Sequence, residues 1–119
     1  MVESGRDQVI DAMASAPVWA MARPGYVETL RALMLGAPPR GATEFRAEWP
    51  SFRIIELTAE VAEHAVTLAT EHRLRSSDSV HLASALLIRD VDDVGVATFD
   101  GRLAAAAVTE GLAVVPEVL

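Results

Sequence analysis

Several absences in the sequence narrow the possible functions. The chain has no cysteine, which excludes disulfide bonds, thiolate metal sites and thiol nucleophiles. It has no lysine either, and its 10 basic residues are outnumbered by 17 acidic ones, giving a net charge of -7. That balance argues against a protein that grips nucleic acid broadly through its phosphates, because such binding needs a basic surface. No apolar run is long enough to span a bilayer, and no signal-like core follows the first residues.

The length and composition of the chain are typical of one globular domain. At 119 residues and 51% hydrophobic, residues 1–119 can build one substantial core but not two. We expect a cytoplasmic protein with no membrane segment. The acidic excess still allows an enzyme that gathers carboxylates around a cation and meets its substrate with a few arginines.

Hydrophobic periodicity predicts helices that alternate with short strands. Helices are expected over residues 7–16, 26–35, 43–49, 59–72, 76–89 and 101–110, and strands over residues 18–21, 52–57, 94–98 and 112–115. Residues 36–41 are expected as a break, and Thr58 as the N-cap of the helix that begins at residue 59. The strands are continuously apolar, so the predicted fold is α/β, a doubly wound parallel sheet flanked by helices.

Three acidic residues lie where these elements start, end or turn. Asp100 follows an expected strand, Asp78 begins a helix, and Glu28 lies just inside the helix after the first strand. Functional residues of parallel sheets collect at the carboxyl ends of the strands, and oxygen ligands suit hard cations such as Mg²⁺ or Mn²⁺. If they converge, these carboxylates form a metal-dependent hydrolase site. Taken singly, Asp78 and Asp100 are also ordinary helix N-caps, and Glu28 an ordinary solvated residue.

Segments in a fixed order resemble a known family. Residues 75–87 (RSSDSVHLASALL), 96–104 (VATFDGRLA) and 110–115 (EGLAVV) look like the C-terminal half of a PIN domain, and Tyr26–Arg31 resembles the segment with the family's second acidic residue. Within that superfamily the chain is most similar to VapC-like toxin ribonucleases, over nearly its whole length. The resemblance implies a domain that cleaves RNA with Mg²⁺ or Mn²⁺, forms homodimers and is neutralised by a cognate antitoxin.

The resemblance implies roles for three residues, and four residues near them are supporting candidates. Glu28, Asp78 and Asp100 are the expected catalytic, metal-binding carboxylates. The supporting candidates are Ser77 and Thr98, whose hydroxyls would orient a carboxylate or a water, His81, which would line the site, and Arg102, which would meet a phosphate.

Plainer interpretations apply to several of these neighbours. A histidine hydrogen-bonded to the backbone is the preferred interpretation of His81, and an exposed first-turn arginine that of Arg102. His64 and His72 are expected on the surface of their helix. Trp49, like Trp19, is expected to pack in the core or at its edge, because no basic residues interleave with the tryptophans as in a base-stacking surface.

One departure from the family pattern is serious. PIN domains of this kind open with a central hydrophobic strand that ends in an aspartate, and the first residues here match only the stretch leading into the family's second helix. The expected sheet therefore lacks its first central strand, and the site lacks one metal-binding aspartate. A start assigned too late or a truncated gene is preferred over a functional compact variant, and another segment or chain would otherwise have to fill the gap. We expect hydrolysis by this chain to be impaired.

Two alternative functions differ from the nuclease interpretation. The chain is alternatively a catalytically inactive PIN-like module that binds an antitoxin or a second copy of itself. A receiver-like domain phosphorylated on Asp100 is disfavoured, because such a domain needs a lysine. The RNA target and the identity of the antitoxin are not encoded in any motif of this sequence.

Overall fold

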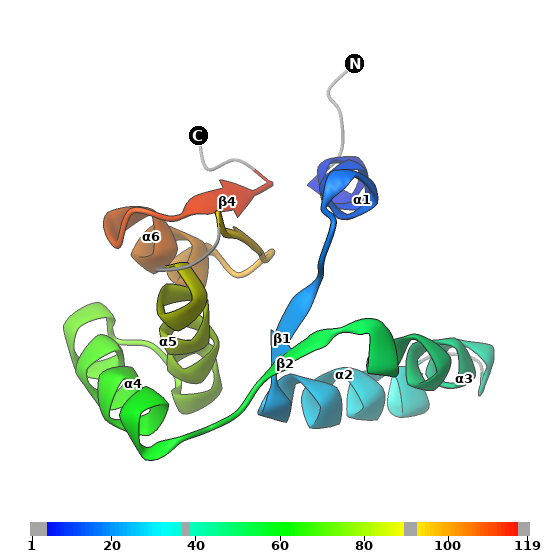
Figure 1. The fold of residues 1–119 in the computed structure, drawn as a ribbon, viewed down its shortest axis with the longest axis horizontal. Coiled ribbons are helices and arrows are strands. Elements are labelled where there is room, and N and C mark those ends of the chain that lie inside the picture. The colour runs from blue at the N-terminus through cyan, green and yellow to red at the C-terminus, as the bar shows by residue number, and fades with distance from the viewer. Residues whose placement is uncertain (1–4, 37–38, 90–92, 117–119) are drawn as a thin grey trace.

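The computed structural model describes residues 5–36, 39–89 and 93–116. In this part of the chain, helices and short strands alternate (Figure 1). The helices are α1 (Gly5–Ser15), α2 (Arg23–Gly36), α3 (Pro39–Glu48), α4 (Ala59–His72), α5 (Ser76–Arg89) and α6 (Gly101–Thr109), with the short 3₁₀ turn η1 (Trp49–Ser51). The strands are β1 (Ala20–Ala22), β2 (Arg53–Ile55), β3 (Gly95–Ala97) and β4 (Ala113–Val115). No helix in the described ranges is long and apolar enough to cross a membrane.

Most of these elements agree with the sequence prediction, and α4 has the predicted limits. Its N-cap is Thr58, whose Oγ1 accepts a hydrogen bond from the amide of Val61 at 3.2 Å, as predicted. The predicted break over residues 36–41 extends too far, because α3 already begins at Pro39. Proline is tolerated in a first helical turn, where its missing N–H would have no helical partner.

The strands are parallel, as the α/β prediction requires, but they form two separate pairs. β1 pairs with β2, with Met21 opposite Ile54, and β3 pairs with β4, with Val96 opposite Val114. Within the described residues no strand joins the two pairs.

Helices cover the two strand pairs in different ways. In Figure 1, α2 and α3 lie on one side of β1 and β2, and α4, α5 and α6 gather on the other side with β4. The α4–α5 packing is the most extensive contact between elements, and α5 also contacts β1. The fold is therefore an α/β domain in which α5 lies between the two halves.

The hydrophobic core is divided in the same way. The larger cluster joins α4, α5, α6 and β4 around the nearly inaccessible side chains of Leu68 and Leu82. The smaller cluster holds Leu30, Ala42 and Phe45, with a rim of half-buried side chains that includes Trp49. Both tryptophans pack at this edge as predicted, since Trp19 stacks edge-on against Phe52 at 5.6 Å between ring centroids.

Candidate active site

Two of the predicted carboxylates share a pocket at the starts of α5 and α6. Asp78 lies in the first turn of α5, and Asp100 is the N-cap residue of α6. The pocket has a volume of about 280 Å³, and its lining is completed by Gly101 and two arginines, Arg75 and Arg102. Asp78 and Asp100 are well separated in the sequence, and the fold brings them into one pocket. This agrees with the expectation that the carboxylates converge, for two of the three.

Asp100 combines a structural contact with an available oxygen. Its Oδ1 accepts a hydrogen bond from the amide of Leu103 at 2.9 Å, which satisfies one of the free donors at the start of α6. The carboxylate has a second oxygen, so capping the helix and binding a cation are compatible. The plain N-cap interpretation of Asp100 is confirmed, and it does not exclude the functional one.

The hydroxyl and arginine candidates have distinct positions. Thr98 Oγ1 accepts a hydrogen bond from the amide of Asp100 at 3.0 Å, so Thr98 positions the backbone of that residue. Arg102 lines the pocket and donates from Nη1 to the carbonyl oxygen of Arg73 at 3.2 Å, which anchors it to the end of α4. Ser77 is half-buried beside Asp78 in the first turn of α5.

Glu28 approaches the site through a histidine. His81 Nε2 and Glu28 Oε1 are 2.7 Å apart, which joins α5 to α2. His81 lies three residues after Asp78, one turn along α5, so this pair borders the end of α5 that carries Asp78. Glu28 does not line the pocket of the two aspartates. The preferred interpretation of His81 was wrong about its partner, which is a carboxylate rather than the backbone.

A glycine makes room for this histidine. A Cβ added to Gly25 on α2 would lie 3.2 Å from Cε1 of His81 and 2.5 Å from Cγ of Met21. The second distance is shorter than any normal carbon contact, so a larger residue at position 25 would force the Met21 side chain to move and would crowd His81. The sequence contains the Pro24-Gly25 pair, but its meaning depends on a contact that a sequence pattern does not reveal.

The donor chemistry of the pocket fits a hard divalent cation. Asp78 and Asp100 supply only carboxylate oxygens, and Mg²⁺ is commonly held by one or two carboxylates with several waters. Arg75, which sequence reasoning did not single out, adds a second positive side chain beside Arg102. Two guanidinium groups beside two carboxylates suit the binding of a phosphate group next to a cation, because guanidinium groups bind phosphate and the carboxylates would bind the cation.

A charged pair of a different kind lies at the ends of β1 and β2. Arg23 follows β1 and Glu56 follows β2, and Arg23 Nε donates to Glu56 Oε1 at 2.9 Å. This hydrogen bond is the main cause that lowers the pKa of the Glu56 carboxyl below its ordinary value, and both side chains are exposed. The pair links the carboxyl ends of the two strands outside the pocket.

The two other histidines behave differently from each other. His64 is exposed, as predicted. The prediction of a surface position for His72 is wrong, since only 15% of its side chain is accessible and its Nε2 lies 2.7 Å from Oε2 of Glu110. Glu110 is 38 residues further along the chain, so periodicity within one helix could not reveal the pair.

Comparison with known proteins identifies the family. Residues 3–109 match the PIN domain. Two curated proteins of Mycobacterium tuberculosis, Ribonuclease VapC45 of strain CDC 1551 / Oshkosh and Ribonuclease VapC49 of strain H37Rv, are each 48% identical to this chain over 68 residues. The match covers 57% of this chain and 46% of each relative, so the chain matches less than half the length of these curated relatives.

A solved structure shares the fold. It is a toxin-antitoxin complex from Klebsiella pneumoniae, with a TM-score of 0.65 and 23% identity. The superposition covers 80% of this chain and 74% of the other chain. At that level of identity the likeness concerns the fold alone.

Proposed function

Because this chain belongs to the PIN-domain family, we propose that it forms the metal-binding part of a Mg²⁺- or Mn²⁺-dependent endoribonuclease of a toxin–antitoxin system. The observation that carries the proposal is the pocket that Asp78 and Asp100 line together with two arginines. The ribonuclease names of the relatives support the choice of substrate and reaction. The partners of such a protein are an RNA substrate, a cognate antitoxin and a second copy of the chain.

Each side chain of the site would have its own role in phosphodiester hydrolysis. Asp78 and Asp100 would hold the cation, and Glu28 would join them if His81 released it. When bound, a cation lowers the pKa of a water and offsets charge that develops on the phosphoryl oxygens. Arg75 and Arg102 would hold the phosphate, because a guanidinium offers paired N–H donors to its oxygens. Thr98 would keep Asp100 in place through its amide.

We propose further that hydrolysis by this chain alone is weak. Among the residues that the structure describes, only Asp78 and Asp100 bring carboxylates to the pocket, and Glu28 lies 2.7 Å from His81 and does not line it. Fewer anionic ligands mean a weaker cation site and less charge compensation in the transition state.

Cleavage of a structured RNA in the presence of Mg²⁺ or Mn²⁺ tests the proposal. We expect slow, metal-dependent cleavage that Asp100→Asn abolishes. Asp11→Asn is the matched control, because Asp11 is an exposed aspartate on α1. Rapid cleavage that Asp100→Asn abolishes would keep the site and refute the impairment. Cleavage that persists without metal or in Asp100→Asn would refute the site itself.

A second candidate function is favoured by an exposed apolar strip on α2. Val27, Met34 and Leu35 have 65%, 62% and 71% of their surface exposed. A catalytically inactive PIN-like module could use this strip to bind an antitoxin or a second copy of the chain. Calorimetric titration with Mn²⁺ separates the two functions. Mn²⁺ binding that Asp78→Asn and Asp100→Asn remove supports the nuclease, and the absence of binding that depends on these two aspartates supports the inactive module.

A further inference from the structure

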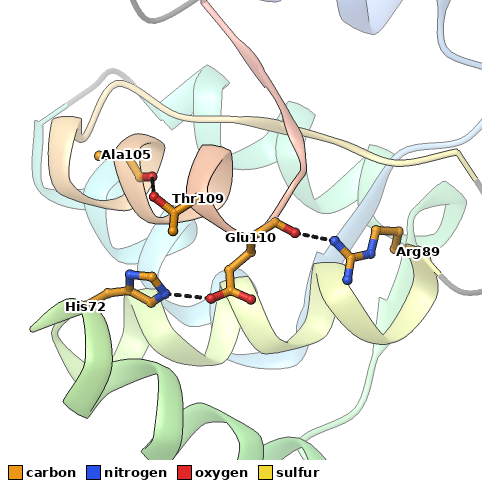
Figure 2. A network of polar contacts seen from close by, with 5 residues as sticks. All are labelled: His72, Arg89, Ala105, Thr109 and Glu110. Atoms are coloured by element: carbon orange, nitrogen blue, oxygen red, sulfur yellow. Dashed lines mark hydrogen bonds and ion pairs between the residues drawn. The ribbon is translucent and has the colours of Figure 1, made fainter.

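A second group of potential metal ligands lies at the other end of α6. Among the described residues, only Glu71, His72 and Glu110 form a group of three ligand-type side chains whose donor atoms lie within 4.8 Å of one another. Figure 2 shows the His72 ring pointing at the Glu110 carboxylate from the end of α4. None of these residues lines the pocket of Asp78 and Asp100.

Two of the three ligands are held in place by the fold. His72 ends α4, and the next residue, Arg73, has the left-handed φ of 54° that closes the helix. Glu110 is the C-cap of α6, where Gly111 turns the chain into β4 with a φ of 90°. Arg89 Nη1 donates to the Glu110 carbonyl oxygen, which anchors the Glu110 backbone to α5 and leaves its carboxylate for His72 (Figure 2). The His72 and Glu110 side chains are only 15% and 27% exposed, whereas Glu71 is exposed and free to turn toward them.

The helix ends around this group favour positive charge. α4 ends at His72 and α6 ends at Thr109, so two helix C-termini meet here with their partial negative charge. Cations are stabilised at such ends, because the last carbonyl groups of a helix carry partial negative charge. Arg89 is a competing cation, but the oxygen it uses is a main-chain carbonyl.

The donor types select a particular class of metal. We propose that Glu71, His72 and Glu110 bind a Zn²⁺-type divalent cation that ties α4 to α6. One imidazole nitrogen with two carboxylates suits zinc better than magnesium, which prefers oxygen ligands and its own waters. Three protein ligands and a water complete a tetrahedral site.

The geometry requires only a small adjustment. Ligand atoms about 2.0–2.1 Å from a tetrahedral zinc are about 3.3 Å apart. His72 Nε2 and Glu110 Oε2 are now 2.7 Å apart, so they need to separate by about 0.6 Å to admit the ion. The exposed Glu71 supplies the third ligand by a rotamer change. This site is distinct from the pocket, because the ten-residue step from Asp100 to Glu110 along α6 spans about 15 Å.

Isothermal titration of the full chain with Zn²⁺ tests the site. With excess Mg²⁺ present to occupy the pocket of Asp78 and Asp100, we expect saturable binding of one Zn²⁺ ion. His72→Ala and Glu110→Gln should each weaken binding by about tenfold or more, since loss of even an outer-shell partner costs a metal site that much. His64→Ala is the matched control, because His64 is an exposed histidine on the same helix. Asp100→Asn should leave zinc affinity unchanged, and circular dichroism checks that each variant is folded.

A measurement on the unaltered chain covers the case in which a variant does not fold. The ring resonances of His72 should shift on addition of one equivalent of Zn²⁺, and those of His64 should not. The proposal is overturned if no saturable zinc binding occurs, if His72→Ala and Glu110→Gln bind as the unaltered chain does, or if Asp100→Asn removes the binding.

Discussion

The two halves of this domain differ in the side chains that form their cores, so we call the half before Glu56 the aromatic half and the half after it the aliphatic half. The half before Glu56 holds five of the six aromatic residues, and Tyr26, Phe45, Trp49 and Phe52 form a connected cluster of rings 4.8–6.2 Å apart. The half after it has a core of leucine, valine and alanine, and its one aromatic residue, Phe99, is 70% exposed. Each half has its own pair of parallel strands.

The two halves also differ in how fully their core side chains are buried. In the aromatic half the smaller hydrophobic cluster contains three buried side chains, those of Leu30, Ala42 and Phe45, and the partly buried rings of Tyr26 and Trp49 pack against them. In the aliphatic half, alanines on α6 such as Ala104 and Ala107 let helices pack closely over a continuous buried cluster. Small side chains permit close approach of helices, whereas a few large rings fill space while leaving edges in water. We therefore expect the aliphatic half to carry most of the stability.

The largest predicted effect tests the aliphatic half. Leu82→Ala on α5 should lower the free energy of unfolding by about 3–5 kcal/mol, because Leu82 is 1% exposed and its removal leaves a cavity in the larger cluster. Urea denaturation followed by circular dichroism measures it. Leu87→Ala, on the same helix but 39% exposed, is the control and should cost far less. Equal losses in the two variants would show that the core of this half is not where the structure places it.

The next prediction tests the aromatic half. Phe45→Ala should cost about 2–3 kcal/mol, less than the loss at Leu82 although the side chain is larger, because the half-exposed rings can close over the gap. Trp19 and Trp49 both belong to this half, so tryptophan fluorescence reports on it while circular dichroism reports on all helices. In Phe45→Ala we expect the fluorescence transition at a lower urea concentration than the circular dichroism transition. Coincident transitions would mean that the halves unfold as one unit.

A smaller effect is expected where the halves meet. Glu28 on α2 and His81 on α5 form a partly exposed pair that joins them. A double-mutant cycle with Glu28→Gln and His81→Ala should give a coupling of about 0.5–1 kcal/mol, typical of a pair that water screens in part. The cycle is measured by urea denaturation with tryptophan fluorescence. A coupling of zero would mean that the contact does not hold the halves together.

The smallest effect concerns the exposed Arg23–Glu56 pair. Its hydrogen bond lowers the folded-state pKa of Glu56, so its contribution is present above the unfolded pKa and is lost as the pH falls through the folded pKa. Arg23→Ala should therefore be slightly less stable than the unaltered chain at neutral pH, and the difference should disappear in acid. Thermal melts of both proteins across that pH range measure it. A difference that grows toward acid would contradict the assigned sign.

The features that the sequence predicted share a local cause. The limits of α4 follow from Thr58 and a helical period, and the end of α6 follows from Gly111, because each signal lies within a few residues of what it controls. The order of the motifs was enough to predict that Asp78 and Asp100 lie close together. The pairs Glu28–His81 and His72–Glu110 were not, since they join residues 53 and 38 positions apart and depend on how helices pack. The start of α3 differs from the prediction because Pro39, one of the residues that favour a break, lies in the first turn of the helix instead.

The helix α6 has a mechanical consequence for both candidate sites. It carries Asp100 at its first end and Glu110 at its last, and its nine residues contain neither proline nor an internal glycine. A helix this short without a kink moves as a rigid rod. A rigid-body displacement of α6 that carries Glu110 away from His72 therefore also moves Asp100 relative to Asp78, whereas a rotation of the Glu110 side chain alone leaves Asp100 in place. A spectroscopic probe at the Asp100 end of the helix thus separates a movement of the helix from a movement of the side chain.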